Sequence, residues 1–250
     1  SRVKPLIADT ASSAYSALTG GSRVTFAVGQ MVCVSCDKVV VQLRERAAKI
    51  WDVEVDDVEW VAGSAINRKS SKNETLSLAE IANVAGKTGG PISGQASSDV
   101  QGAGPGFGTH ICDVEVDPET GRSTVIRYTA IQDVGTAIHP SYVEGQLQGG
   151  AAQGIGWALN EEYIYNDNGC LENGGFLDYR MPVASDLPMI DTVVVEVPNP
   201  NHRFGVRGVG EVPIVPPLAA VANAVSAAAN VRMADLPISP PKLLAAIDAK

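Results

Sequence analysis

Glu211 lies in a stretch that otherwise carries a single charge, that of Arg207. The segment reads GVRGVGEVPIVPPLAAVANAV, so small glycines precede the carboxylate and a long apolar run rich in Pro and Ala follows it. Small and apolar neighbours solvate a carboxylate poorly, which raises its pKa. We expect the Arg207 side chain to point away from Glu211 or to pair with another group. The alternative is a surface carboxylate that stabilises the start of a helix.

Three glycine-bearing segments indicate backbone that lies close to another group. They are TGGSR at 19 to 23, EGQLQGGAAQGIG at 144 to 156 and GVRGVGE at 205 to 211. A helical glycine costs about 1 kcal/mol relative to alanine, so such clusters need a physical reason. In the second segment the glycines leave one side of a helix bare, with Gln153 as its strong hydrogen-bonding group. This pattern predicts a wall for a flat, polar cofactor, and tight internal packing is the alternative. No segment matches the phosphate-binding fingerprints GxxxxGK[ST] or GxGxxG.

A C-x-x-C pair, Cys33 and Cys36, could form a redox dithiol or half of a zinc site. A zinc site needs further ligands, but Cys112 and Cys170 are single and distant, and the three histidines lack ligand spacing. Apolar residues recur at spacings of three and four through this region, which predicts a helix that carries both thiols. We therefore expect Cys33 and Cys36 to be reduced, packed core thiols.

Helical and β-strand patterns are mixed along the chain, which favours the α+β class. The run THICDVEVDPETGRSTVIRYTAIQDVG predicts two strands joined by a turn at 118 to 121. Two shorter strands are expected around the Ala-Gly turn in WDVEVDDVEWVAGSAIN, and another in MIDTVVVEVPNP. Further helices are expected in TLSLAEIANVAGKTGG, in PPLAAVANAVSAAAN, where Pro217 suits the first turn, and in ISPPKLLAAID. The segment SYVEGQLQGGAAQGIGWALNEEYIY predicts a helix that runs into a strand.

Composition limits the classes of protein that this chain could be. Its 250 residues, 45% of them hydrophobic, can bury the core of one large domain or two small ones. A formal net charge of -9 repels phosphates, so we expect no nucleic-acid binding. No apolar run approaches about 18 residues and the start lacks signal-peptide features, so we expect a cytoplasmic protein without a membrane span.

Several motifs agree in type and order with one known family. They are ADTASSAYSALTGGSRVTFAVGQMV, THICDVEVDPETG, IQDVGTAIHPSYVEGQ, GQLQGGAAQGIGWALNEEYIY, GGFLDYRMPVASDLP and GVRGVGEVPIVPPLAAVANAV. Together they resemble the C-terminal half of the molybdenum-binding (large) subunit of the xanthine dehydrogenase, aldehyde oxidase and aerobic carbon monoxide dehydrogenase family. The resemblance covers nearly the whole chain and implies that residues 1–250 form the second molybdenum-cofactor-binding domain, of α+β fold.

The resemblance implies a molybdenum hydroxylase that uses a molybdopterin cytosine dinucleotide and takes its oxygen from water. In the family the carboxylate of a Val-Gly-Glu motif is the general base that deprotonates a metal-bound hydroxyl, and Glu211 matches it here. The resemblance places Gln153 near the metal as a hydrogen-bond donor. No metal ligand from the protein is expected, because the pterin dithiolene holds the molybdenum. The resemblance also assigns further residues to the cofactor. Those that contact it through backbone amides and hydroxyls are Thr19, Gly20, Gly21, Ser22, Arg23, Val24 and Thr25. Val209 and Gly210 are assigned to it because they precede the base in the Val-Gly-Glu motif.

The implied partners are the N-terminal half of the large subunit, an iron-sulfur subunit with 2Fe-2S clusters and an FAD subunit, in a dimer of the whole assembly. The implied substrate is an aldehyde, a purine or other N-heterocycle, or carbon monoxide. His139 lies where relatives often have Asn. A non-catalytic cofactor-binding or assembly protein that retains the fold is the alternative, but the presence of Glu211 and Gln153 favours the enzyme.

Overall fold

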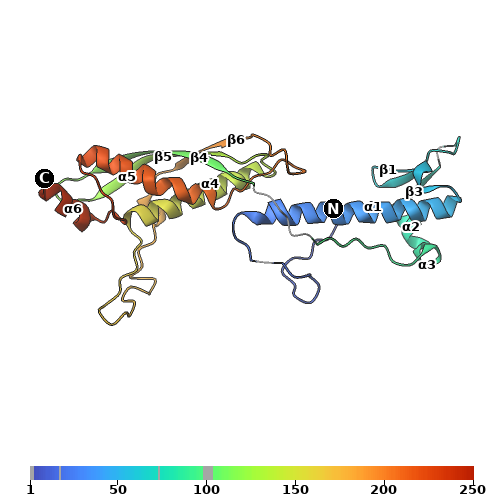
Figure 1. Ribbon diagram of the computed structural model, residues 1–250, viewed down its shortest axis with the longest axis horizontal. Coiled ribbons are helices and arrows are strands. Elements are labelled where there is room, and N and C mark those ends of the chain that lie inside the picture. Colours follow the sequence, from blue (N-terminus) through green and yellow to red (C-terminus); the bar gives the residue numbers. More distant parts are fainter. Residues whose placement is uncertain (1–2, 17, 73, 98–103) are drawn as a thin grey trace. The chain divides into compact units, whose positions relative to one another are not determined.

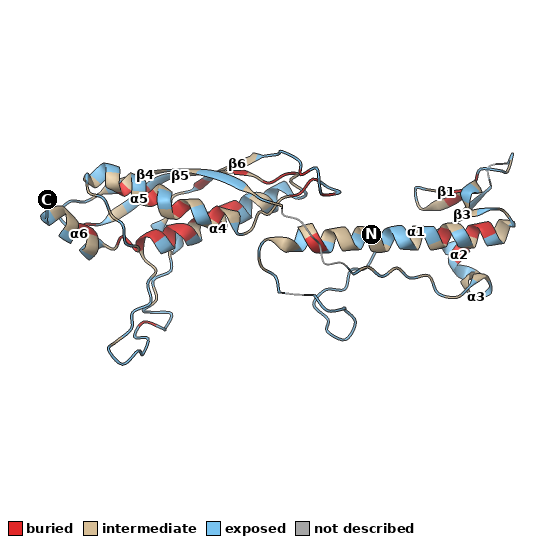
Figure 2. Cartoon of the chain, in the orientation of Figure 1, coloured by how far each residue is buried: buried red, intermediate tan, exposed pale blue. Residues whose placement is uncertain are grey.

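The structure is a computed structural model that describes residues 3–16, 18–72, 74–97 and 104–250. The chain divides into two compact units, the first made of Ser1–Phe26 and Ala103–Lys250 and the second of Ala27–Gly102. Each unit has its own three-stranded sheet and its own hydrophobic core (Figures 1 and 2). The mixture of helices and sheets confirms the α+β class.

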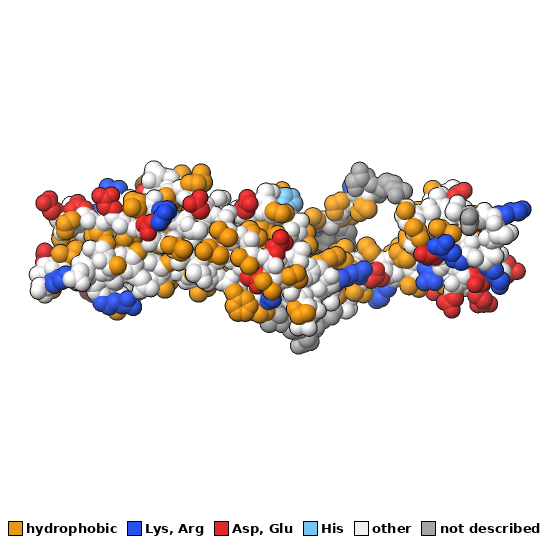
Figure 3. Space-filling model, turned by 90° about the horizontal axis from the view of Figure 1, so that it is seen from above, with side chains coloured by type: hydrophobic (Ala, Val, Ile, Leu, Met, Phe, Trp, Pro, Cys, Tyr) orange, Lys and Arg blue, Asp and Glu red, His pale blue; other side chains and the backbone are white. Residues whose placement is uncertain are grey.

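The second unit packs a long helix against a small antiparallel sheet. The predicted Ala-Gly turn is present: Ala62 and Gly63 have φ values of 50° and 85°, as a tight hairpin turn requires. Acidic and basic side chains are intermixed on the face of this unit seen in Figure 3. The elements are α1 (Gly29–Trp51), a 3-10 turn (Val55–Asp57), β1 (Val58–Val61), β2 (Ser64–Asn67), β3 (Thr75–Ser77), α2 (Leu78–Asn83) and α3 (Ala85–Thr88).

Helix α1 carries Cys33 and Cys36, as the periodicity predicts, but neither is a core thiol. Cys36 is exposed and Cys33 is half-buried, and both are free thiols. The buried residues of α1 lie in its C-terminal half, at Leu43, Ala47 and Ala48, where the helix covers the sheet. The prediction of packed core thiols was therefore wrong, because the apolar periodicity continues beyond the part of the helix that contacts the sheet.

The first unit places helices against one face of a mixed sheet. Strands β4 (Phe107–Val116) and β5 (Ser123–Asp133) form the predicted antiparallel hairpin, and Gly121 in its turn has a φ of 72°. Strand β6 (Ile190–Val195) runs parallel to β5, although only antiparallel pairing was expected. Helices α4 (Pro140–Leu159), α5 (Val215–Ala229) and α6 (Pro240–Asp248) complete the unit, with 3-10 turns at Ala184–Asp186 and Val212–Ile214 (Figure 1). Their shared core includes Tyr128, Leu147, Ile155, Val221, Val225 and Leu243.

A short π-helix, Val24–Val28, begins in the first unit and ends in the second. The strand expected after α4 is not formed, because its residues make only the isolated bridge between Tyr165 and Leu171.

The glycines of α4 serve helix packing. A Cβ atom at Gly150 would lie 2.5 Å from Pro213 Cγ, and one at Gly154 would lie 2.6 Å from the carbonyl oxygen of Ile214. Pro213 and Ile214 belong to the turn that leads into α5, so the bare side of α4 is filled by this chain. For Gly150 and Gly154 the prediction of a cofactor wall was therefore wrong, and tight internal packing is the reason for them. Gly149 has nothing within 4 Å of an added Cβ atom, so packing does not explain it.

Two helical stretches, Val24–Trp51 and Val212–Ala229, are long and apolar enough to cross a membrane by length and composition alone. The core helix of a soluble protein passes the same test. In the second stretch, Val221 and Val225 are fully buried in the core of the first unit.

A network around Asp133, the last residue of β5, fixes the segment that follows β6. Its Oδ2 atom pairs with Nε of Arg207 at 3.1 Å, and both side chains are 12% exposed. Its Oδ1 atom accepts hydrogen bonds from the backbone N–H groups of Gly135 at 2.9 Å and Val197 at 3.1 Å. The Arg207 Nε also donates to the Val197 carbonyl. The expectation that Arg207 pairs with another group is confirmed.

A second buried polar pair joins β4 to β5. His110 Nδ1 lies 2.8 Å from the hydroxyl of Tyr128, which is fully buried. Burial lowers the pKa of His110 from 6.5 to about 4, because a charged imidazole is poorly solvated there. His110 is therefore neutral in the folded protein near pH 6.

We predict that the free energy of unfolding decreases as the pH falls from 6.5 towards about 4, because the unfolded chain protonates His110 in this range and the folded chain does not. His110→Gln should remove this part of the pH dependence. Urea unfolding above and below this range measures it, with His139→Gln, at an exposed position, as the control. An unchanged pH dependence in His110→Gln would contradict the prediction.

Loss of the Asp133 carboxylate should leave Arg207 as an unpaired, largely buried cation. We predict that Asp133→Ala lowers the free energy of unfolding by about 3 kcal/mol. The matched control is Asp113→Ala, whose partner Arg127 forms an exposed pair with side-chain exposures of 42% and 68%; that change should cost under about 1 kcal/mol. Urea unfolding measures both changes. An equal decrease in the free energy of unfolding in the two variants would show that the Asp133 pair stabilises the fold no more than an exposed pair does.

Candidate functional site

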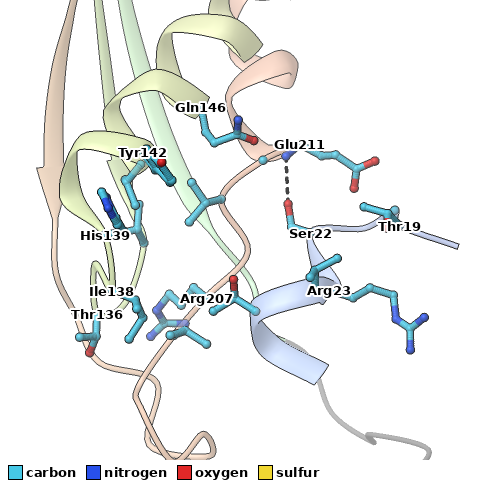
Figure 4. Close-up of a pocket in the computed structure, with 18 residues that line it drawn as sticks. Thr19, Ser22, Arg23, Thr136, Ile138, His139, Tyr142, Gln146, Arg207 and Glu211 are labelled. Carbon is cyan, nitrogen blue, oxygen red and sulfur yellow. Dashed lines mark hydrogen bonds between the residues drawn. The ribbon is translucent and has the colours of Figure 1, made fainter. Parts of the chain in front are cut away.

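A pocket of about 500 Å³ opens in the first unit, where the segment from 19 to 25, the start of α4 and the segment from 206 to 211 meet (Figure 4). Hydroxyls and apolar side chains share its walls, and Glu211 is its only carboxylate among the described residues. Its lining consists of Thr19, Gly20, Ser22, Arg23, Val24, Thr25, Val134, Thr136, Ile138, His139, Tyr142, Val143, Gln146, Val206, Arg207, Val209, Gly210 and Glu211.

Glu211 stands at the end of the glycine-rich segment, directly before the turn Val212–Ile214. Its backbone N–H donates a hydrogen bond to Ser22 Oγ at 3.0 Å (Figure 4). The carboxylate extends past Gly21, where a Cβ atom would lie 3.9 Å from Oε2. The Glu211 side chain is exposed in this chain, so the expected poorly solvated position is not found. Small neighbours such as Gly21 leave one side of the carboxylate open to water.

Glycines allow the segment from 206 to 211 to pack closely on Ser22. A Cβ atom at Gly208 would lie 3.2 Å from Ser22 Cβ, and one at Gly210 would lie 3.1 Å from Gln146 Oε1. Ser22 itself has a φ of 55°, in the left-handed region. Gly208 and Gly210 are therefore explained by this close approach, whereas Gly205 adopts a φ of 68° and lies against Thr136 and Pro198.

Most of the predicted site residues lie together in the pocket. Thr19, Gly20, Ser22, Arg23, Val24, Thr25, Val209, Gly210 and Glu211 line it, and Gly21 adjoins the carboxylate. Gln153 lies outside this lining, at an exposed position on α4. The roles assigned to all of these residues, including Gln153, stay predictions.

The structure adds pocket residues that the sequence interpretation did not select. Gln146 lies on the same face of α4 as Gln153 but two turns nearer its start, and it lines the pocket. The rings of His139 and Tyr142 stack at 3.9 Å between centroids and also line it. Pro140 at the start of α4 was the available signal, because it marks the helix end that lies at the pocket.

The sequence interpretation also did not select His202, which fixes one edge of the site. It is buried, its Nε2 lies 2.9 Å from the carbonyl oxygen of Phe26, and the backbone N–H of Phe204 donates to its Nδ1. Since Nδ1 accepts, Nε2 carries the proton and donates to Phe26. This bond joins two segments of the first unit that are distant in sequence.

The pocket suits a ligand that combines anionic groups with a flat polar ring. The hydroxyls of Thr19, Ser22 and Thr25 and the Arg23 cation on the same segment are donors for phosphate oxygens. On the opposite wall, Gln146 offers an amide and Tyr142 an aromatic ring. A carboxylate beside these donors can accept a proton from a bound group.

Comparisons with known proteins show which proteins this chain resembles. The chain is 38% identical over 156 residues to a putative xanthine dehydrogenase molybdenum-binding subunit of Escherichia coli, covering 62% of this chain and 21% of that protein. It is 30% identical over 236 residues to 6-hydroxypseudooxynicotine dehydrogenase complex subunit gamma of Paenarthrobacter nicotinovorans, covering 89% of this chain and 29% of that one.

A solved structure shows the same fold. The reconstituted CO dehydrogenase from Oligotropha carboxidovorans matches with a TM-score of 0.80 and 25% identity, over 96% of this chain and 31% of that chain. The chain thus spans less than a third of the length of these relatives. Residues 1–188 match the family described as the molybdopterin cofactor-binding domain. The chain belongs to this family of molybdopterin cofactor-binding domains.

Proposed function

We propose that this chain is the cofactor-binding C-terminal part of a molybdenum hydroxylase, which oxidises a carbon centre with water as the source of oxygen. The observation that supports this most is the pocket, where Glu211 meets the donor-rich segment from 19 to 25 in a chain of the molybdopterin-binding family. The substrate class is an aldehyde, a purine or other N-heterocycle, or carbon monoxide, in keeping with the names of its relatives.

The residues of the pocket fit a molybdopterin cytosine dinucleotide. Thr19, Ser22, Arg23 and Thr25 would hold its phosphate and pterin oxygens, and the small residue Gly20 exposes backbone N–H groups to it. When bound, the molybdenum cofactor supplies the two-electron oxidation of the substrate carbon. We propose that the electrons leave through 2Fe-2S clusters and FAD on partner subunits.

Glu211 is the general base of the proposed reaction. Its carboxylate oxygens accept a proton when oxygen is transferred to the substrate. Arg207 is bound by Asp133, so it does not form an ion pair with Glu211. Gln146 lies beside Gly210 and orients the bound group by donating a hydrogen bond from its amide.

The proposed assembly contains the N-terminal half of the large subunit, an iron-sulfur subunit and an FAD subunit, and it forms a dimer in the cytoplasm. The matched part of this chain spans 21% and 29% of two relatives, and the N-terminal half is part of the assembly whether residues 1–250 are a fragment of the large subunit or a separately encoded half of it. Residues 1–250 act together in it as the second molybdenum-binding domain.

We predict that Glu211→Gln removes turnover in the assembled enzyme and leaves the molybdenum content unchanged, because it removes the proton acceptor but keeps the shape of the side chain. Steady-state turnover and metal analysis on the same sample measure both quantities. Glu119→Gln, in an exposed turn, is the control and should keep full activity. Loss of molybdenum in Glu211→Gln would point to a structural role, and full turnover would refute the assignment of the base.

Of the two glutamines of α4, Gln146 lines the pocket and Gln153 does not, so their variants can be compared. We predict that Gln146→Ala lowers molybdenum retention or turnover by about tenfold, as expected for loss of one hydrogen bond to a bound group. Gln153→Ala, at the position that the family resemblance places near the metal, should have a milder effect. Molybdenum per chain and turnover per molybdenum measure both effects. A larger loss in Gln153→Ala than in Gln146→Ala would show that Gln153 is the glutamine that binds the cofactor.

A further inference from the structure

We infer that Ser22 is a positioning residue for Glu211: its hydroxyl fixes the backbone from which the carboxylate extends. The inference rests on the proposed function, because it takes Glu211 to be the base. It concerns an interaction within this chain and is separate from any contact of Ser22 with a cofactor.

The hydrogen bond between the two residues is the first evidence. Ser22 Oγ accepts from the Glu211 backbone N–H at 3.0 Å, across 189 positions of sequence. Glu211 precedes the turn Val212–Ile214, and its side chain makes no capping hydrogen bond there. The carboxylate is therefore free of the turn. The backbone of Glu211 is held by its N–H, which donates to Ser22, and by its carbonyl oxygen, which accepts from the Ile214 N–H at 3.4 Å.

Both partners are shaped for this contact. Ser22 adopts a left-handed φ of 55°, which is uncommon for residues other than Gly, Asn and Asp. On the other side, a Cβ atom at Gly208 would lie 3.2 Å from Ser22 Cβ and one at Gly210 would lie 3.4 Å from Ser22 Oγ. Larger residues at either glycine would push the segment away from the hydroxyl.

Each of the two segments is also held independently of the Ser22 contact. The carbonyl oxygen of Gly208 accepts from Gln132 Nε2 at 3.3 Å, and the N–H of Gly208 donates to Gly104 at 2.9 Å. The buried His202 donates to the Phe26 carbonyl, four residues after Ser22. The Ser22 hydroxyl therefore bridges two supported segments and sets the distance between them at Glu211.

The same hydroxyl keeps its own hydrogen. Because Oγ acts as acceptor toward Glu211, the O–H is still available as a donor. Ser22 lines the pocket, so this donor can reach a bound group. Ser22 thereby links the position of the base to the occupant of the pocket.

Hydrogen exchange at one amide tests the inference in the full chain without cofactor. Ser22→Gly removes the hydroxyl and relieves the left-handed backbone, so it isolates the hydrogen bond. We predict that the Glu211 amide exchanges about three- to tenfold faster in Ser22→Gly, measured by NMR on the labelled chain. Ser22→Asn tolerates the backbone angle and retains an oxygen acceptor, so it should restore part of the protection.

Ser239→Gly is the matched control, because Ser239 precedes α6 and its side chain makes no capping hydrogen bond. The Glu211 amide should exchange at the wild-type rate in this variant. An unchanged rate in Ser22→Gly, or an equal increase in Ser239→Gly, would overturn the inference.

Turnover of the assembled enzyme separates positioning from cofactor binding. If Ser22 positions the base, Ser22→Gly lowers kcat per bound molybdenum by about tenfold with little change in KM. A loss of molybdenum with unchanged kcat per molybdenum would overturn the inference and leave Ser22 as a cofactor contact only. If the proposed function is wrong, the result is different: Glu211→Gln keeps its turnover. The faster exchange of the Glu211 amide in Ser22→Gly does not depend on the proposed function.

Discussion

The largely buried ion pair between Asp133 and Arg207 is the constraint on which the site depends. One carboxylate ends β5, binds the guanidinium with one oxygen and accepts two backbone N–H groups with the other. Breaking a pair of this kind leaves a charge without solvent or partner, which is far more costly than losing an exposed pair. The segment from 205 to 211 therefore leaves the sheet in a fixed direction, and its one cation is engaged before the chain reaches Glu211.

Glycine packing sets the position of Glu211 from both sides. In the segment that precedes Glu211, Gly208 and Gly210 allow Ser22 to approach closely. The turn that follows Glu211 and leads into α5 packs on Gly150 and Gly154 of α4. An alanine at Gly150 or Gly154 would force the turn to shift, because its Cβ would lie 2.5 Å from Pro213 Cγ or 2.6 Å from the Ile214 oxygen. The contacts at Gly208 and Gly210 are less tight, at 3.2 Å and 3.4 Å from Ser22 atoms. The carboxylate itself makes none of these contacts. It is carried to the pocket by the packing of its neighbours, which leaves it free for chemistry.

The parts of the fold that depend on local signals could be predicted from the sequence. The turn at 118 to 121, the proline-started helices α4 and α5, and the Ala62-Gly63 turn are all of this kind. The parallel pairing of β6 with β5 is non-local and left no local signal. Periodicity also places Gln146 and Gln153 on one helix face and cannot choose between them. Likewise, a glycine stripe looks the same whether a ligand or a proline fills the space beside it.

The exposure of Glu211 bears on how the site is completed. A base that must act on a bound group works best where water is excluded, because its contacts are then stronger and competing proton acceptors are absent. In this chain the donors, the aromatic ring and the carboxylate form part of such a wall, and one side of the carboxylate faces solvent. The matched part of this chain spans 21% and 29% of two relatives. The open side of Glu211 is therefore where the proposed function needs further protein, such as the proposed N-terminal half, to exclude water from the base.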